Sequence, residues 1–360
     1  MSNLANTPQR RSRWLVAAAA ATACSLVAGC GAGTAGTAGA ASAAGQVNIA
    51  FLGYSAANGY TKSSFEAAQK AAAKYGARVT FFDGKFDGAT QIAQARDAIA
   101  SGKYQALEIM PNNSRQLAPV VKDALAKGIK VAAIDYVIGE DPEAVGKAGV
   151  NGITVQIADN MAEGGRAQGG LAVSLCKGIS PCNAMIMVGS KASDFDTVKL
   201  REIKKVISRH PNIKVVSEAE ASFDEVKAER ITRDVLQAHP DLNIIITTGD
   251  QHCFGAQRAA EAAGKHFSAT TQQGGGKIAC LGWGAARESV DQILAGRWPS
   301  SITLVPATFG AKAAEYLIKS VKNPKTPPLI TTQSQLSPIG RVATRQTLED
   351  HPSFKGEWNK

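Results

Sequence analysis

Short apolar runs alternate along the chain with longer stretches in which apolar positions recur at helical spacing. From residue 47 onward the apolar runs predict strands at 47–53, 78–83, 106–110, 129–135, 183–189, 213–217, 243–248, 278–283 and 301–305. The stretches between them predict helices, the clearest at 62–75, 89–101, 114–127, 156–175 and 225–238. Strands that are apolar throughout are typical of a parallel sheet covered by helices on both faces.

Glycines mark the ends of the first three predicted helices, at Gly76, Gly102 and Gly128. Glycine adopts the left-handed conformation of a helix terminus at little cost, so these positions support the boundaries. The strand–helix plan runs once to about Asp135 and starts again near Asn183. Because crossovers between parallel strands are right-handed, each series predicts a doubly wound sheet, and the repeat predicts an α/β protein with two similar lobes.

The first 29 residues have the layout of a secretory signal. Three arginines precede an apolar, alanine-rich run that closes in LVAGC at Cys30, a sequence that resembles a bacterial lipobox. A transmembrane anchor is the alternative, but the apolar run of about 14–28 is shorter than the roughly 20 residues that span a bilayer. We expect cleavage of 1–29, lipidation of Cys30 and a flexible Gly/Ala/Thr/Ser tether over 30–45. The mature protein is then held to the cell membrane, facing the periplasm or the cell exterior.

The charge pattern does not indicate a nucleic-acid surface. The formal net charge is +10, but the leader holds three arginines and no acid, so 37 basic and 30 acidic residues remain, or +7. Basic and acidic residues are interspersed, as around Arg201 and Glu202. Such mixing is typical of a solvated helix face, and we expect no nucleic-acid partner.

Four cysteines follow the lipidation site, at Cys176, Cys182, Cys253 and Cys280. In an exported protein, disulfides are the default expectation for such thiols. Cys176 and Cys182 flank a short Gly/Pro loop, which makes a local bridge easy. Cys253 with Cys280 is the remaining pairing and stays open. A metal site is the competing interpretation, but the thiols form no CxxC and have no histidine at ligand spacing, so we expect no metal.

Polar and aromatic side chains follow the predicted strands, where ligands of open parallel sheets bind. They include Asn58, Tyr60 and Thr61 after the first strand, Asp135 and Tyr136 after the fourth, Phe223 after the sixth, Asp250 after the seventh, and Trp283 at the end of the eighth. Aromatic rings stack on the C–H faces of a sugar or polyol, while carboxylates, amides and ammonium groups bond its hydroxyls. Taken singly, each residue is equally well an ordinary helix cap or loop side chain. Their joint position predicts a site for a small neutral polar ligand.

The sequence gives little support to an enzyme. It contains no GxSxG elbow, no HExxH, no Walker loop and no GxGxxG directly after a strand. A transcription repressor of the same fold would need a DNA-reading module at the N-terminus, where this chain has a leader and a tether. We therefore expect a binding protein that needs no cofactor.

Four blocks of sequence carry a family resemblance: IAFLGYSAANGYTKSSFEAAQKAAAKYG, LEIMPNNSRQLAPVVKDALAKGIKVAAID, SEAEASFDEVKAERITRDVLQAHPDLNIIITTGD and IACLGWG. Together they resemble the type I periplasmic sugar-binding proteins, the ribose/galactose-binding family of ABC importers. The resemblance spans about 46–345. It implies five ligand contacts, namely Asn58, Tyr60 and Thr61 in the first loop, the hydroxyl acceptor Asp135 and the aromatic wall Phe223.

The chain departs from the ribose binders in ways that bear on the ligand. Lys199 and Tyr136 stand where they have arginines, and Gly249, Gly284 and Leu304 stand at positions of polar contacts. A site built around hydroxyls rejects ligands that leave its buried groups unpaired. We therefore expect another pentose, a polyol, a cyclitol or a related polar molecule, with Trp283 as a broad stacking face.

The resemblance also implies the domain organisation. Three crossover strands, near 151–153, 303–307 and 331–335, would join a first lobe of 46–151 with about 305–332 to a second lobe of 152–304 with about 333–360. The lobes would close on the ligand as a hinge and the closed monomer would dock on an ABC permease. The alternative function is a receptor for an autoinducer-like sugar signal that reports to a membrane sensor, in which Asp194 and Asp135 would suit a cyclic polyhydroxy ligand.

Overall fold

The computed structural model describes residues 45–359. The predicted signal sequence, the lipidation site Cys30 and nearly all of the predicted tether lie outside the described residues, so those predictions stay untested. Within the described part, no helix is both long enough and apolar enough to cross a bilayer.

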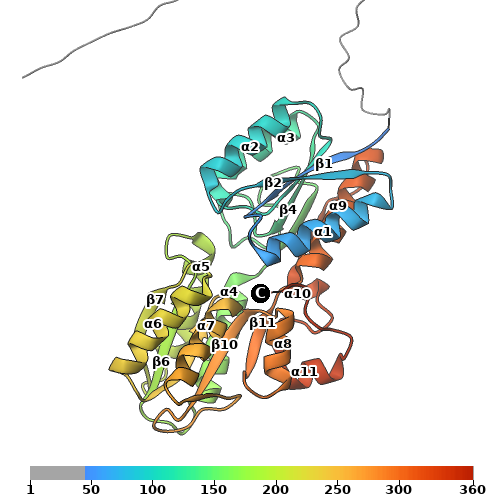
Figure 1. Cartoon of the computed structure of the whole chain (residues 1–360). Coiled ribbons are helices and arrows are strands. Elements are labelled where there is room, and N and C mark those ends of the chain that lie inside the picture. The colour runs from blue at the N-terminus through green and yellow to red at the C-terminus, as the bar shows by residue number, and fades with distance from the viewer. Residues whose placement is uncertain (1–44, 360) are drawn as a thin grey trace, which may run out of the picture. The chain divides into compact units, whose positions relative to one another are not determined.

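The first sheet contains six strands, all paired in parallel (Figure 1). Its order is β12-β5-β4-β3-β1-β2. The first elements of the chain build most of it: β1 (Asn48–Gly53), α1 (Gly59–Ala73), β2 (Arg78–Asp83), α2 (Gly88–Ala100), β3 (Ala106–Ile109), α3 (Ser114–Ala126), β4 (Lys130–Asp135) and β5 (Val155–Ala158). Two later elements complete it: α9 (Pro306–Lys322) and β12 (Leu329–Thr332). We call this sheet with α1, α2, α3 and α9 the first lobe.

The second sheet repeats the same winding, with the order β13-β11-β10-β8-β6-β7 and β9 paired to β10. Its elements are α4 (Met161–Leu175), β6 (Cys182–Val188), α5 (Asp194–Ile207), β7 (Ile213–Glu220), α6 (Glu225–Ala238), β8 (Leu242–Thr247), α7 (Asp250–Ala262), β9 (His266–Phe267), β10 (Lys277–Gly284), α8 (Arg287–Leu294) and β11 (Ser300–Thr303). Only β13 (Val342–Thr344) runs antiparallel, against β11. We call this sheet with α4 to α8 the second lobe. The predicted doubly wound α/β fold with two similar lobes is confirmed.

Apolar side chains cover both faces of each sheet, which explains why the central strands are apolar throughout. Helices α1 and α9 pack together on one face of the first sheet, and α2 and α3 cover the other. In the second lobe α4 and α5 share one face, whereas α6, α7 and α8 share the other. The carboxyl ends of the parallel strands in each sheet are thus left for loops, which is where the candidate ligand residues were predicted.

Each predicted strand is present, with ends that differ by no more than three residues from the prediction. The predicted helix at 156–175 is partly wrong, because β5 occupies its first residues and α4 begins only at Met161, where Asn160 caps it. Gly76, Gly102 and Gly128 have φ values of 67°, 64° and 79°, as predicted for helix ends.

Strand β5 pairs with β4 and β12, so it belongs to the first sheet. The chain therefore leaves the first sheet after Ala158, later than the predicted crossover at 151–153. It returns between β11 and α9, and it leaves again between β12 and β13 through the short helix α10 (Gln333–Leu336). These last two connections fall near the predicted 303–307 and 331–335.

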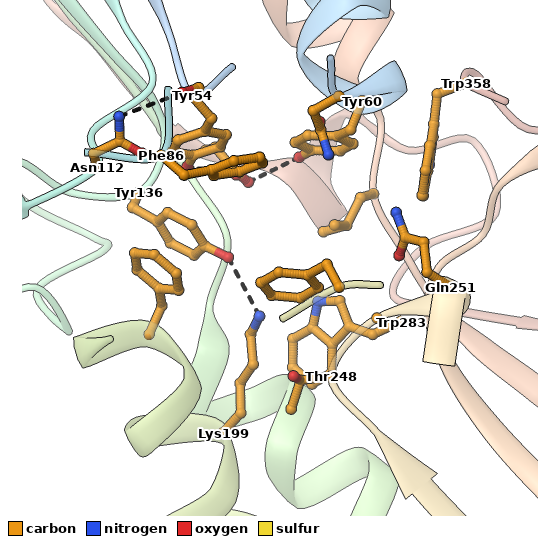
Figure 2. Close-up of a pocket in the computed structure, with 16 residues that line it drawn as sticks. Tyr54, Tyr60, Phe86, Asn112, Tyr136, Lys199, Thr248, Gln251, Trp283 and Trp358 are labelled. Atoms are coloured by element: carbon orange, nitrogen blue, oxygen red, sulfur yellow. Dashed lines mark hydrogen bonds between the residues drawn. The ribbon is translucent and has the colours of Figure 1, made fainter. Parts of the chain in front are cut away.

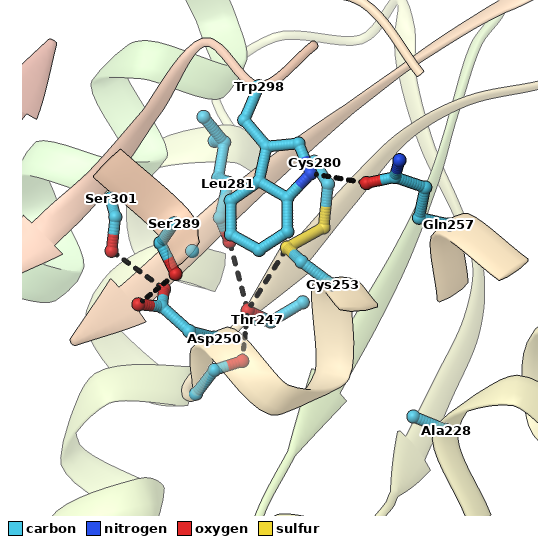
Figure 3. The surroundings of a disulfide bond; sticks show 12 residues. Ala228, Thr247, Asp250, Cys253, Gln257, Cys280, Leu281, Ser289, Trp298 and Ser301 are labelled. Atoms are coloured by element: carbon cyan, nitrogen blue, oxygen red, sulfur yellow. Dashed lines mark hydrogen bonds between the residues drawn. A yellow bond between two sulfur atoms is a disulfide. The ribbon is translucent and has the colours of Figure 1, made fainter. Parts of the chain in front are cut away.

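Both disulfides are present. Cys176 and Cys182 lie 5.7 Å apart at Cα and close the loop between α4 and β6. Cys253 on α7 is bonded to Cys280 on β10, with 5.9 Å between their Cα atoms (Figure 3). The second bridge fixes a helix covalently to the central strands of the second sheet.

Candidate ligand-binding site

A cavity of about 110 Å³ lies at the carboxyl ends of strands from both sheets (Figure 2). This is several times the roughly 10–15 Å³ that one water molecule requires, so a small organic ligand has room. The cavity is lined by Tyr54, Asn58, Tyr60, Phe86, Asn112, Asp135, Tyr136, Phe195, Lys199, Phe223, Thr248, Gly249, Gln251, Trp283, Leu304 and Trp358. Seven of the ten predicted site residues are in this lining: Asn58, Tyr60, Asp135, Tyr136, Lys199, Phe223 and Trp283.

Asp135 is the centre of the first-lobe side of the cavity. It ends β4 with a φ of 74°, an unusual backbone conformation for a residue other than glycine. Its Oδ2 accepts a hydrogen bond from the Tyr54 hydroxyl at 2.8 Å, and its Oδ1 accepts from the Tyr60 hydroxyl at 2.8 Å. The Gln333 amide donates to the same Oδ1 at 2.5 Å. Three donors, from the loop after β1, from α1 and from α10, therefore hold one buried carboxylate in place.

Burial of this carboxylate raises the pKa of Asp135 to about 6, with the charge of Asp159 acting in the same direction. The hydrogen bonds from Tyr54 and Tyr60 and the charge of Lys199 oppose that rise. Burial also raises the pKa of both tyrosines well above the usual value. Because each tyrosine hydrogen already points at Asp135, the two hydroxyl oxygens present only lone pairs to the cavity. The first-lobe side therefore offers acceptors to a ligand.

The second-lobe side offers donors. Lys199, only 2% exposed, places its ammonium 3.3 Å from the Tyr136 hydroxyl and 3.6 Å from Asp196 Oδ1. An ammonium group has three N–H donors, so at least one remains for a ligand. The Trp283 indole N–H is buried and has no hydrogen-bond partner among the described residues. Figure 2 shows Lys199 and Trp283 side by side, across the cavity from Tyr54 and Tyr60.

Aromatic rings supply half of the lining. Tyr136 and Phe195 stack with their centroids 4.3 Å apart and their planes 2° from parallel. The Lys199 ammonium lies 4.5 Å from the Trp283 ring centroid, a cation–π contact that partly compensates its burial. Trp283 approaches α4 so closely that a Cβ at Gly164 would lie 2.4 Å from its Cη2 atom. A glycine in that helix therefore makes room for the indole.

Phe223 is held by a buried histidine. Its ring stacks on His252 with the centroids 5.4 Å apart, and its backbone N–H donates to His252 Nε2 at 3.2 Å. Burial, together with the charge of Lys199, lowers the pKa of His252 to about 3. The imidazole is thus neutral at physiological pH and positions an aromatic wall of the cavity.

Two of the predicted ligand residues, Thr61 and Asp250, lie outside the lining, and neighbouring groups bond both of them. The Thr61 hydroxyl and N–H both donate to Asn58 Oδ1 in the first turn of α1. Asp250 accepts hydrogen bonds from Ser289 Oγ and Ser301 Oγ, each at 2.7 Å (Figure 3). A third bond comes from the Ala286 N–H at 2.9 Å. Asp250 therefore joins α7 to the strand and helix beside it.

The third residue outside the lining, Asp194, lies at the start of α5. Its carboxylate forms an ion pair with Arg115 of α3 at 3.0 Å, and both side chains are more than a third exposed. A second exposed pair joins Arg201 to Glu143 at 2.7 Å. Both pairs connect the α5 helix of the second lobe to segments that follow first-sheet strands. Asp194 thus belongs to a polar contact between the lobes.

Nine residues of the lining were not among the predicted site residues: Tyr54, Phe86, Asn112, Phe195, Thr248, Gly249, Gln251, Leu304 and Trp358. Tyr54, Asn112 and Thr248 follow β1, β3 and β8 within a few residues, so the strand-end rule could have found them. Trp358 comes from the C-terminal segment, which follows no strand of either parallel series, and no sequence signal marks it.

The described residues contain no cluster of three or more His, Cys, Asp or Glu side chains arranged to hold a metal ion.

Residues 49–325 match the model of a family described as a periplasmic binding protein domain. The chain belongs to this family. In the first lobe the match covers every strand except β12 and the first residue of β1. In the second lobe it covers every strand except β13.

Curated relatives of this periplasmic binding protein are sugar-binding proteins by name. The D-allose-binding periplasmic protein of Escherichia coli K12 is 24% identical over 66% of this chain and 72% of its own length. The ribose import binding protein RbsB of Bacillus subtilis 168 is 25% identical over 69% of this chain and 72% of its own length. The predicted family and the prediction of a binding protein instead of an enzyme are confirmed by these matches.

Solved structures share the fold of this periplasmic binding protein at low sequence identity. A galactofuranose binding protein superimposes with a TM-score of 0.71 at 19% identity, covering 86% of this chain and 98% of the other. The Caulobacter myo-inositol binding protein gives 0.69 at 19% identity, covering 85% and 95%. The two-lobed architecture thus recurs almost over the whole length of both proteins.

Proposed function

We propose that this protein captures a small polyhydroxylated ligand, a sugar, polyol or cyclitol, in the cavity between its lobes and delivers it unchanged to an ABC importer. The observation on which the proposal rests most is the pairing of an acceptor side around Asp135 with a donor side at Lys199 and Trp283, separated by aromatic walls. Nothing in this arrangement requires a bond of the ligand to change.

The two sides of the cavity define how such a ligand would lie. Its hydroxyl hydrogens would face Tyr54, Tyr60 and the Asp135 carboxylate, where lone pairs are available. Its ring oxygen or another acceptor would face the Lys199 ammonium and the Trp283 N–H, which lack sufficient partners. A buried donor without a partner costs about 1–3 kcal/mol, so a ligand oxygen that satisfies Trp283 would bind favourably.

The relatives and neighbours narrow the chemical class without identifying one ligand. The named relatives bind D-allose and ribose, and one solved neighbour holds myo-inositol. All three compounds are compact rings with hydroxyls around their edge and C–H groups on their faces. The aromatic walls of this cavity fit such faces.

The membrane arrangement is part of the same proposal. The leader and the LVAGC sequence support export and lipidation at Cys30, which would tether the protein to a membrane as a monomer near its permease. Mass spectrometry of the mature N-terminus tests this, because an unmodified Cys30 or a cleavage elsewhere would contradict it. The alternative of a signal receptor has no specific observation in its favour.

A thermal-shift panel of pentoses, hexoses, polyols and cyclitols, followed by isothermal titration calorimetry, tests the proposed ligand class. A ligand at a hundred times its Kd stabilises the folded state by about 2.7 kcal/mol, a readily detected shift. We expect at least one neutral polyhydroxylated compound to bind with 1:1 stoichiometry and to lose binding in Trp283→Ala. A panel without a binder, or binding indifferent to that substitution, would contradict the proposal.

A further inference from the structure

The C-terminal segment 354–359 contacts the two lobes alternately. Phe354 is buried in the apolar core of the second lobe, beside α8. The Trp358 carbonyl accepts a hydrogen bond from the Arg287 N–H of α8 at 2.9 Å. Between these second-lobe anchors, the Glu357 carbonyl accepts from Ser63 Oγ of α1 at 2.5 Å. A tail that simply packed on one lobe would not alternate in this way.

Glu357 caps a helix of the other lobe. The N-cap residue of α9, Val305, has an apolar side chain that provides no capping hydrogen bond. The Glu357 carboxylate takes this role, because its Oε2 accepts from the Thr308 N–H at 2.9 Å and its Oε1 accepts from the Thr308 hydroxyl. A carboxylate is favourable at a helix N-terminus, where backbone N–H groups and the helix dipole both attract negative charge. The tail thus attaches to α9 close to the point where the chain re-enters the first lobe.

Trp358 is part of the cavity wall. It is 4% exposed, and its ring meets the Tyr60 ring edge-on, with centroids 5.6 Å apart at 84°. Its indole N–H donates to the Gly284 carbonyl at the end of β10 at 3.0 Å. A Cβ at Gly284 would lie 2.6 Å from Trp358 Cζ2, so the close fit needs glycine there. Trp358 therefore touches a first-lobe side chain that bonds Asp135 and a second-lobe strand that carries Trp283.

We infer that residues 354–359 form a C-terminal latch that ties the first-lobe helices α1 and α9 to the second lobe and completes the cavity with Trp358, a specificity-determining wall. The latch adds an attachment between the lobes to the three chain connections and the two exposed ion pairs of α5. The role of Trp358 in ligand specificity rests on the proposed ligand-binding function. The attachment of the lobes by the C-terminal segment does not.

Hydrogen–deuterium exchange without any ligand tests the attachment. We expect Glu357→Ala, made in the full chain, to raise amide exchange in the first turn of α9 by roughly fivefold, because the helix loses its cap. Glu349→Ala is the matched control, since Glu349 is an exposed glutamate of α11 (Arg345–Asp350) that pairs with Arg345 at 3.6 Å. It should leave α9 unchanged. Equal amide exchange in the first turn of α9 in Glu357→Ala and in the wild type would overturn the proposal that the C-terminal segment attaches to this helix.

Calorimetric titration with D-allose, D-ribose and myo-inositol tests the wall. We expect Trp358→Ala to weaken binding by about tenfold or more and to change the order of preference among these probes, with Trp358→Phe intermediate because it keeps a ring against Tyr60. Unchanged ligand binding in Trp358→Ala would overturn the proposed role of Trp358 in specificity. Tighter binding would overturn it too, because it would show that the C-terminal segment obstructs the site. If wild type binds none of the three, the proposed ligand class fails for these compounds, and the exchange experiment still decides whether the latch exists.

Discussion

The two sides of the cavity differ in how far their polar groups are satisfied by the protein itself. On the first-lobe side, Asp135 receives three internal hydrogen bonds from elements far apart in the sequence. On the second-lobe side, Trp283 lacks a partner among the described residues and Lys199 has spare donors. A fully bonded group fixes the shape of a site, whereas an underbonded group gains most when a ligand arrives. The comparison suggests that the first lobe pre-forms the site and the second lobe supplies most of the gain on binding.

The largest expected effect comes from Asp135→Ala, which removes the acceptor of Tyr54, Tyr60 and Gln333 together. Leaving three buried donors unpaired should lower the free energy of unfolding by about 4 kcal/mol and abolish ligand binding. Urea denaturation and titration calorimetry measure the two effects. Asp194→Asn is the control, because its exposed pair with Arg115 should contribute less than about 1 kcal/mol. A stable, binding-competent Asp135→Ala protein would remove Asp135 from the centre of the site.

Removal of the Cys253–Cys280 disulfide should have the next largest effect. Cys253 lies on the helix that carries Gln251, and Cys280 lies on the strand that carries Trp283, so the bridge joins two parts of the lining (Figure 3). The double substitution Cys253→Ser/Cys280→Ser should reduce the free energy of unfolding by about 3 kcal/mol. It should also weaken ligand binding, whereas Cys176→Ser/Cys182→Ser should affect stability alone. Equal binding losses in both double variants would show that the second bridge has no special connection with the site.

The pH dependence of stability should reveal Asp135 directly. Because its pKa rises from the ordinary value near 3.8 to about 6 on folding, the folded protein holds this proton more tightly than the unfolded chain does. The stability linked to Asp135 is thus fully present below about pH 4 and is lost as the pH rises through 6, by about 2–3 kcal/mol. Urea denaturation at pH 4 to 7.5 measures this loss, which should be absent from Asp135→Asn. Parallel pH profiles in the two proteins would contradict the raised pKa.

Lys199→Met tests the donor side. The substitution keeps an apolar stem against Trp283 but removes the ammonium, so ligand affinity should fall by about 2 kcal/mol. Titration calorimetry measures the loss, and Lys205→Met on the same helix, at an exposed position, is the matched control. A larger loss of ligand affinity in Lys199→Met than in Tyr54→Phe would support the conclusion that the second lobe supplies most of the gain on binding. The reverse order would indicate that the first lobe contributes more of the binding energy.

The sequence predicted most of the fold because its signals are local. An apolar run defines each central strand, and glycines mark the helix ends, so strands and winding could be assigned without tertiary information. Strand β5 was missed because VQIA is short and leads within two residues into the helix that begins at Met161. Its strand character comes from pairing with β4 and β12, which lie at distant positions in the chain.

The cavity lining was predicted in part, and the differences between the predicted residues and the lining have a common cause. An acid after a strand has the same sequence pattern whether it faces a cavity, as Asp135 does, or bonds Ser289 and Ser301, as Asp250 does. Phe195 and Trp358 enter the lining from a helix and from the C-terminal segment, so the strand-end rule does not apply to them. Which side chains turn inward depends on packing between lobes, and that information is not local in the sequence.

A crystal structure of the protein with D-allose, D-ribose or myo-inositol, whichever gives the largest thermal shift, tests the central claim most directly. The account predicts one ligand between the lobes, with its hydroxyls on Tyr54, Tyr60 and Asp135 and an oxygen within hydrogen-bond distance of both Lys199 Nζ and Trp283 Nε1. A ligand bound elsewhere, or one in this cavity that leaves the Trp283 N–H unbonded, would contradict it.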